Sequence, residues 1–176
     1  LLISASPDAQ GDPVLQALGD KITQIAANLT WAGYLSTTGV YGDTGGDWVS
    51  EDTPINPSTQ RGQRRKAAEQ AWRAIPNLPL HIFRLAGIYG PGRGPFAKLR
   101  AGTARRIIKP GQMFSRIHVD DIAQVLAASM DRPNPTAIYN VCDDMPAPPQ
   151  DVISYAASLL GMPPPPEVPF EQAEMS

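Results

Sequence analysis

A glycine-rich segment between residues 87 and 94 contains residue types that could bind a phosphate group. It follows an apolar run, and its glycines are spaced as Gly87-x-x-Gly90-x-Gly92-x-Gly94. A strand that leads into a glycine-rich turn is the usual setting of a pyrophosphate site. Two prolines argue against that chemistry, because Pro91 and Pro95 each remove a backbone N–H that the anion would need. We therefore interpret the segment as a turn rather than a pyrophosphate site.

A second candidate for anion chemistry is the basic cluster at residues 61–66, which contains Arg61, Arg64, Arg65 and Lys66. Guanidinium groups bind phosphates and carboxylates through paired hydrogen bonds. The same pattern is also typical of the solvated start of a helix, and both interpretations stay open. The whole chain has 15 Lys and Arg against 17 Asp and Glu, a formal net charge of −2. This balance gives no electrostatic argument for a nucleic acid or an anionic membrane as partner.

The remaining reactive side chains are few, and they favour no metal site. The single cysteine, Cys142, excludes an intrachain disulfide and a cysteine-cluster metal site, and we expect it to be a buried, inert thiol. His81 and His118 are expected to support packing. The scarcity of cysteine fits a reducing compartment. No apolar run approaches the roughly 18 residues of a membrane span, and no signal peptide is evident, so we expect a cytoplasmic protein without a membrane partner.

Short apolar runs alternate with amphipathic stretches, which predicts βα units around a parallel sheet in an α/β fold. The expected strands are residues 1–5, 32–36, 80–85 and 137–141. The expected helices are residues 12–27, capped by Asp12 and started by Pro13, then 60–75, 120–130 and 150–160. A glycine- and proline-rich loop is expected at 41–58. Residues 106–108 and 113–117 flank a Lys-Pro-Gly-Gln turn, which favours a hairpin.

Four sequence blocks resemble the extended short-chain dehydrogenase/reductase family, which includes NAD-dependent epimerases and dehydratases. They are LSTTGVYG at 35–42, RLAGIYGPG at 84–92, IHVDDIA at 117–123 and YNVCDD at 139–144. The resemblance implies a doubly wound Rossmann-type sheet, of which this chain would supply only the later strands. It also implies that about sixty residues, with the family's glycine-rich turn, precede Leu1. Residues 1–176 would then be one partial NAD(P)-binding domain, to which about 90–118 and 143–176 add part of a small substrate lobe.

The resemblance also implies which positions carry the chemistry. In the family a Ser or Thr holds the substrate oxygen, a Tyr acts as general acid and base, and a Lys four residues later binds the ribose. The hydroxyl position corresponds to Thr37, which ends an expected strand. The Tyr and Lys positions correspond to Arg61 and Arg65. An arginine stays protonated and cannot exchange a proton as the tyrosine does, so Tyr41 is considered as a replacement acid.

For the cofactor, NAD or NADP, the implied contacts are Ser36, Thr37, Arg65, Leu85, Ala86 and Gly87. For the substrate they are Tyr89 and Arg116. The arginine that grips the diphosphate in nucleotide-sugar epimerases is replaced here by Phe114, which weakens the case for a nucleotide-sugar substrate.

Two functions remain open from the sequence. One is an NAD(P)-dependent oxidoreductase or epimerase/dehydratase relative with an altered acid–base pair and a small-molecule substrate. The other is a non-catalytic dinucleotide-binding sensor or regulatory protein. The apolar residues at the start of the chain could form an exposed strand edge, so a homodimer is also open.

Overall fold

Four strands pair in parallel to form the central sheet of the first of two structural units. In the computed structural model, which describes residues 1–173, this unit comprises Leu1–Ala86 and Asp120–Val141. The sheet order is β1-β2-β3-β7. The strands are β1 (Leu2–Ile3), β2 (Ala32–Thr37), β3 (Leu80–Leu85) and β7 (Ile138–Val141). Every neighbouring pair is parallel, which confirms the predicted parallel α/β sheet.

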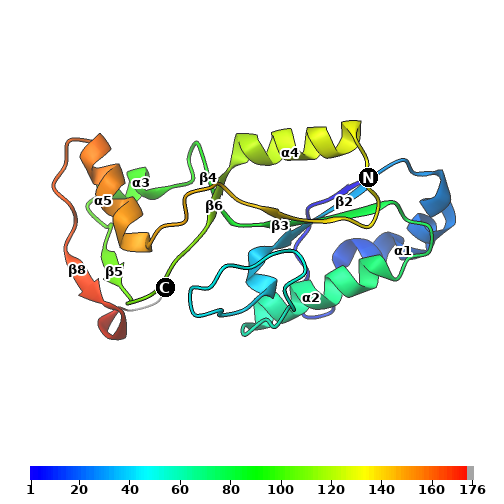
Figure 1. Cartoon of the computed structure of the whole chain (residues 1–176), viewed down its shortest axis with the longest axis horizontal. Coiled ribbons are helices and arrows are strands. Elements are labelled where there is room, and N and C mark those ends of the chain that lie inside the picture. The colour runs from blue at the N-terminus through cyan, green and yellow to red at the C-terminus, as the bar shows by residue number, and fades with distance from the viewer. Residues whose placement is uncertain (174–176) are drawn as a thin grey trace. The chain divides into compact units, whose positions relative to one another are not determined.

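Helices cover both faces of this sheet. Helices α1 (Pro13–Ile25) and α2 (Gln60–Arg73) lie on one face, and α4 (Val119–Asp131) lies on the other (Figure 1). Strand β3 is buried along its whole length, as expected of a parallel strand with both faces covered. The doubly wound arrangement predicted from the sequence is therefore present.

Helix α1 begins where its capping residues predict. The carboxylate oxygen Oδ1 of Asp12 accepts from the backbone N–H groups of Val14 and Leu15, at 2.9 and 3.1 Å, and Pro13 occupies the first turn. The other carboxylate oxygen of Asp12 accepts from the Trp72 indole at 3.0 Å. One residue therefore caps α1 and ties it to α2.

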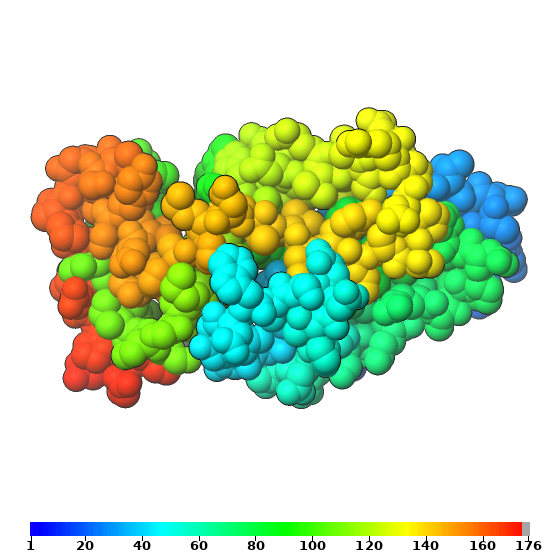
Figure 2. Space-filling view, in the orientation of Figure 1, coloured from blue at the N-terminus to red at the C-terminus, as the bar shows by residue number. Residues whose placement is uncertain are grey.

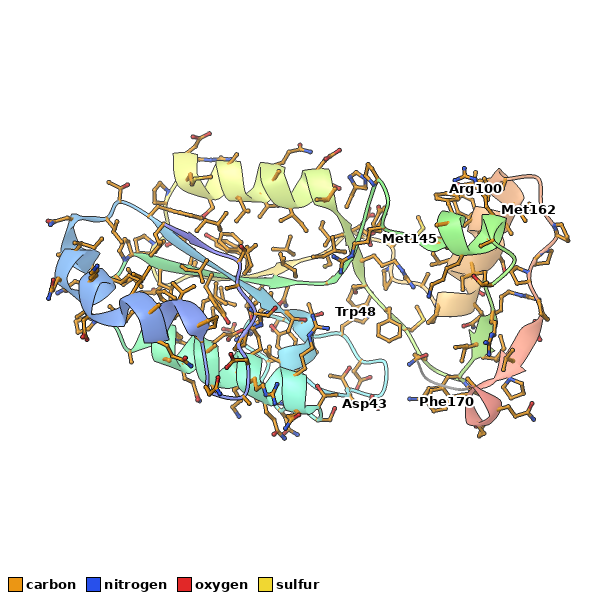
Figure 3. The ribbon with its side chains drawn as sticks, turned by 180° about the vertical axis from the view of Figure 1, so that it is seen from behind. Asp43, Trp48, Arg100, Met145, Met162 and Phe170 are labelled. Atoms are coloured by element: carbon orange, nitrogen blue, oxygen red, sulfur yellow. The ribbon has the colours of Figure 1, made fainter. Side chains whose placement is uncertain are left out.

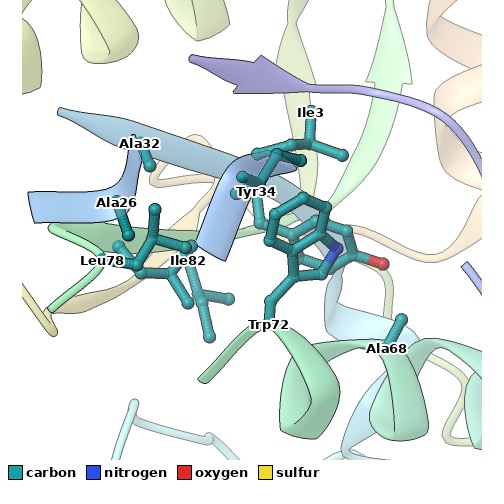
Figure 4. Packing of buried hydrophobic residues seen from close by; sticks show 10 residues of the cluster. Ile3, Ala26, Ala32, Tyr34, Ala68, Trp72, Leu78 and Ile82 are labelled. Carbon is teal, nitrogen blue, oxygen red and sulfur yellow. The ribbon is translucent and has the colours of Figure 1, made fainter. Parts of the chain in front are cut away.

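The hydrophobic core of this unit lies between the sheet and helices α1 and α2 (Figure 4). The Trp72 side chain is fully buried and its ring lies 6.1 Å from that of Tyr34. The other buried members come from both helices, from three strands and from the segments beside them: Ile3, Ile22, Ala26, Ala32, Ala68, Leu78, Leu80 and Ile82. This packing fixes α2 against β2, so the helix presents its first turns at the carboxyl end of the sheet.

The second unit comprises Gly87–Val119 and the segment from Cys142 onward. It contains two pairs of three-residue strands, and its helices α3 (Pro95–Arg100) and α5 (Pro149–Leu159) contact each other. The strand pairs are β4 (Gly87–Tyr89) with β6 (Arg116–His118), and β5 (Arg106–Ile108) with β8 (Glu167–Pro169). Beyond β8, the ring of Phe170 (Figure 3) lies 5.0 Å from Nζ of Lys109.

The hairpin predicted for residues 106–117 is wrong. The turn itself forms, since the Gln112 N–H donates to the Lys109 carbonyl at 3.2 Å. The two flanking segments nevertheless pair elsewhere, because Ile107 lies opposite Val168 and Ile117 lies opposite Ile88, both in parallel register. A turn reverses the chain but does not by itself choose which strands pair.

Three further features of the structure bear on expectations from the sequence: membrane helices, metal clusters and the environment of Cys142. Among residues 1–173, no helix is long and apolar enough to cross a membrane. In the same described part of the chain, no group of three or more His, Cys, Asp or Glu side chains is arranged to hold a metal ion. Cys142 is exposed rather than buried, because it is the first residue after β7, where the chain leaves the sheet.

Candidate functional site

The carboxyl ends of β1, β2, β3 and β7 meet at one edge of the sheet, which is where open α/β sheets bind ligands. The strand register sets three polar residues side by side near this edge. Ser36 lies opposite Arg84, and Arg84 lies opposite Asn140. The edge is therefore polar even though β3 and most of β2 are buried.

These residues belong to a group that we call the Arg84 network, in which Ser36, Tyr41, Glu69 and Arg84 are buried and Asn140 is half-buried. The guanidinium of Arg84 forms an ion pair with Glu69 at 2.9 Å, and these side chains are only 3% and 2% exposed. Arg84 also donates to the Tyr41 hydroxyl at 2.8 Å, which donates in turn to Oδ1 of Asn140 at 2.7 Å. The Ser36 hydroxyl donates to the same Glu69 carboxylate.

The network also anchors the 41–58 loop. The Glu51 carboxylate accepts from the Asn140 backbone N–H at 2.7 Å, and the Glu51 carbonyl accepts from Arg84 at 3.4 Å. Figure 2 shows this loop, in cyan, on the visible face beside the yellow to gold segment that contains β7. Trp48, labelled in Figure 3, lies in the same loop and is 83% exposed. The loop is thus tied down at Glu51 while its aromatic residue faces solvent.

The charges of the network balance internally. Burial lowers the pKa of Arg84, but its hydrogen bonds to Glu69 and Tyr41 and the charge of Glu69 outweigh burial, so the pKa is raised from its ordinary value. Arg84 is accordingly a permanent cation facing a carboxylate, and a buried pair of this kind is stable only when its remaining hydrogen bonds are made.

A different environment surrounds the start of α2, where a cavity of about 350 Å³ is lined by Ser6, Pro7, Arg61, Arg64 and Arg65. We call it the arginine pocket. Arg61 is exposed, Arg64 is half-buried and Arg65 is 6% exposed. The side chains therefore grade from the solvent into the protein.

The guanidinium of Arg65 is fixed by neutral acceptors. It donates to the Leu35 carbonyl at 2.8 Å, to the Tyr34 hydroxyl at 3.1 Å and to the Ser6 hydroxyl at 3.1 Å. Its carbon also lies 5.5 Å from the centre of the Tyr34 ring. Burial raises the pKa of Tyr34 to about 12, although the charge of Arg65 and its hydrogen bond partly offset this. Tyr34 is therefore a neutral phenol at neutral pH.

Two residues at the start of α2, Thr59 and Gly62, determine the position of the pocket arginines. Thr59 caps α2 by accepting from the Gly62 N–H at 3.1 Å. A Cβ on Gly62 would come within 2.8 Å of Pro57 and 2.9 Å of the Gly39 carbonyl, so only glycine lets the helix approach this closely. The close approach holds the first turns of α2 at the sheet edge.

The structure brings six of the predicted cofactor and catalytic residues to the first unit. Thr37 is half-buried, and its hydroxyl accepts from the Gly39 N–H at 3.1 Å. Leu85 and Ala86 are buried at the end of β3, where the Ala86 N–H donates to the Val141 carbonyl at 3.0 Å. Ser36 and Tyr41 lie in the Arg84 network and Arg65 in the arginine pocket. Their proposed contacts with a cofactor stay predictions.

The other three predicted residues, Gly87, Tyr89 and Arg116, lie in the second unit. The ring of Tyr89 meets that of His118 edge-on, with centres 5.2 Å apart. Arg116 donates to the backbone carbonyls of Phe114 and Ala147 at 2.9 and 3.0 Å. Burial lowers its pKa, and the charge of Asp143 only partly offsets this. Substrate binding by Tyr89 and Arg116 stays a prediction.

Sequence reasoning missed four members of this edge: Glu51, Glu69, Arg84 and Asn140. One signal was available, since Arg84 is a charged residue inside an apolar parallel strand, and a buried charge requires a partner. Nothing local pointed to Glu69 as that partner, because the two residues are brought together only by the packing of α2 on the sheet.

Comparison with known proteins places this fold among larger proteins. The chain is 35% identical over 134 residues to protein YeeZ of Escherichia coli strain K12, and it spans about half, 47%, of that relative's length. It matches the structure of a functionally unknown conserved protein from Silicibacter pomeroyi DSS with 68% identity and a TM-score of 0.97, covering all of this chain and 62% of that one.

A more distant match is dTDP-glucose 4,6-dehydratase from Bacillus anthracis in complex with NAD. The identity is 18% and the TM-score 0.81, over 96% of this chain and 59% of the other. No family model matches the chain. The sheet and helices described above therefore share the fold of the matched part of that dehydratase.

Proposed function

We propose that this chain contributes the nicotinamide side of a dinucleotide site, in an NAD(P)-binding protein of the epimerase/dehydratase type. The observation that carries the proposal is the carboxyl edge of four parallel strands, where Thr37 ends β2, Leu85 ends β3 and Ala86 follows β3. Such an edge is the ligand site of doubly wound sheets. The fold shared with a dehydratase that was crystallised with NAD supports the choice of cofactor.

Arg61 and Arg65 stand, in this proposal, where related enzymes carry the tyrosine and lysine. Arg61 cannot cycle a proton, and Arg65 already donates to four acceptors of the protein, those of Ala5, Ser6, Tyr34 and Leu35. Tyr41 is only 4% exposed and its hydroxyl already has two partners. An enzyme built on this edge would take its proton-transfer group from the substrate, from water or from another residue.

A non-catalytic dinucleotide sensor is the second candidate, and the immobilised Arg65 and buried Tyr41 favour it. Both functions require the cofactor, and they differ in turnover. An enzyme would convert a small-molecule substrate together with a change in NAD(P)H absorbance. A sensor would bind reduced and oxidised cofactor with different affinities and leave both unchanged.

Titration with NADH and NADPH tests the shared part of the proposal. Binding should enhance or quench the fluorescence of the reduced nicotinamide and release measurable heat. Substituting Ala86→Val at the end of β3 should weaken binding, while Ala67→Val on the exposed side of α2 should not. Absence of heat and of any fluorescence change with both cofactors at millimolar concentration would refute the proposal.

A further inference from the structure

The arginine pocket gathers positive charge that no ion pair within residues 1–173 balances. Ion pairs join Arg84 with Glu69 and Arg106 with Glu167. Within residues 1–173, therefore, no carboxylate forms an ion pair with Arg61, Arg64 or Arg65. A buried or half-buried cation without a counter-ion is costly, and here one fully buried and one half-buried arginine share a single cavity.

The position of the cluster on its helix adds to the cost. The N-terminus of an α-helix carries partial positive charge and favours acidic side chains in its first turn. Helix α2 has no acidic residue in its first turn and places Arg61 there, followed one turn later by Arg64 and Arg65. The helix N-terminus therefore disfavours the charge of Arg61, and a bound anion would relieve this repulsion.

The cavity is also pre-organised. Arg65 is held by Tyr34, Leu35 and Ser6, so its planar guanidinium has a fixed orientation at the cavity wall. Arg64 and Arg61 stand nearer the solvent on the same helix. A ligand entering from solvent would meet the exposed Arg61 and the half-buried Arg64 first and the buried Arg65 last. A volume of about 350 Å³ lies within the range of small-molecule sites.

We propose that the arginine pocket binds the phosphate or carboxylate group of a small molecule. The site lies between the loop after β1 and the start of α2, and its residues other than Arg65 are separate from the predicted cofactor contacts. Two sources could supply the anion: a second small molecule, or the phosphates of the dinucleotide itself. Both present oxygens that a guanidinium binds in pairs.

Isothermal titration with inorganic phosphate, pyrophosphate and malonate, at constant ionic strength set by chloride, tests the site. Arg64→Gln should weaken binding by about tenfold or more, because each charged hydrogen bond counts strongly toward affinity. Arg61→Gln should weaken it less, since this side chain is exposed. Arg73→Gln is the matched control, because it removes the same charge from the exposed last turn of α2.

A charge-preserving variant separates geometry from electrostatics. Arg64→Lys keeps the charge but loses the paired donors, so its affinity should fall between those of the wild type and Arg64→Gln. Equal weakening by Arg61→Gln, Arg64→Gln and Arg73→Gln would mean that only overall charge matters, and it would overturn the proposal. Undetectable binding of all three anions to the wild-type protein would overturn it as well.

Repeating the phosphate titration with saturating NAD⁺ distinguishes the two sources. Unchanged phosphate affinity supports a second small molecule, and competition supports the dinucleotide's own phosphates as the occupant. This inference does not depend on the proposed function, because the phosphate arm needs no dinucleotide. If NADH fails to bind while Arg64→Gln still weakens phosphate binding, the proposed function fails and the anion site stands.

Discussion

Helix α2 contributes side chains to both the Arg84 network and the arginine pocket, and each of the two regions contains a buried arginine. Arg84 faces the carboxylate of Glu69, and its other donors meet Tyr41 and a backbone carbonyl. Arg65 faces only neutral oxygens and lies on a cavity wall beside two more arginines. One region neutralises its charge inside the protein, whereas the other leaves charge to be neutralised from outside. The Arg84 network therefore stabilises the fold, whereas we propose that the arginine pocket binds a ligand.

The largest expected effect comes from breaking the balanced region. Glu69→Ala would leave Arg84 buried without a counter-charge and should lower the free energy of unfolding by about 3–5 kcal/mol. Urea denaturation measures this loss. Replacing both partners, as Glu69→Gln with Arg84→Gln, should cost less than the sum of the single changes, because the two residues interact directly. Additive losses would show that the ion pair is not the stabilising contact.

The next effect concerns Tyr34, whose hydroxyl links Arg65 of the pocket to the core. Its pKa is about 12 in the folded protein against 10.0 ordinarily, so the folded state retains the phenolic proton that the unfolded state loses. The resulting stability is complete below pH 10 and is lost as the pH rises from 10 to 12. At about 1.4 kcal/mol per pKa unit, the loss is roughly 2–3 kcal/mol. Between pH 10 and 12, the free energy of unfolding should fall less steeply for Tyr34→Phe than for the wild type, as measured by urea denaturation at each pH.

Tyr41→Phe should produce a smaller loss, and it tests what kind of residue Tyr41 is. The change removes the hydroxyl between Arg84 and Asn140 and should lower the free energy of unfolding by about 1–2 kcal/mol. Cofactor affinity should stay the same. If stability stays the same and a measured turnover collapses instead, Tyr41 is an acid catalyst and not a structural member of the network.

Patterns within a short stretch of sequence predicted much of the fold. The spacing of apolar residues identified the four sheet strands, and Asp12 with Pro13 marked the start of α1. The hairpin was wrong because strand pairing is a property of distant segments, and Val168 lies far along the chain from Ile107. The three-residue strands of the second unit carry too few residues for a period-two pattern to show.

The candidate site was predictable only in part, for the same physical reason. Thr37 was identified because a residue at a strand's carboxyl end lies at the sheet edge wherever the rest of the chain packs. The Arg84 network depends on contacts between β2, β3, β7 and α2, which no local pattern encodes. The arginine cluster was visible as charge, but its cavity is formed together with Ser6 and Pro7 from the end of β1.

The smallest expected effect is a gain in stability on replacing Arg61, and it tests most directly whether the arginine pocket differs from the Arg84 network. In the absence of ligand, Arg61→Gln removes a cation from the first turn of α2, where the helix dipole disfavours it, so the free energy of unfolding should rise by about 0.3–1 kcal/mol. Arg73→Gln removes a cation from the last turn, where the dipole favours it, and should lower the free energy by a similar amount. Adding phosphate should stabilise the wild type more than Arg61→Gln. A ligand that binds only the folded protein stabilises most the variant that binds it best. Thermal unfolding of the three proteins with and without phosphate measures both halves of this prediction. If Arg61→Gln destabilises the ligand-free protein as Glu69→Ala does, then Arg61 is a structural residue, and the arginine pocket belongs with the Arg84 network rather than apart from it.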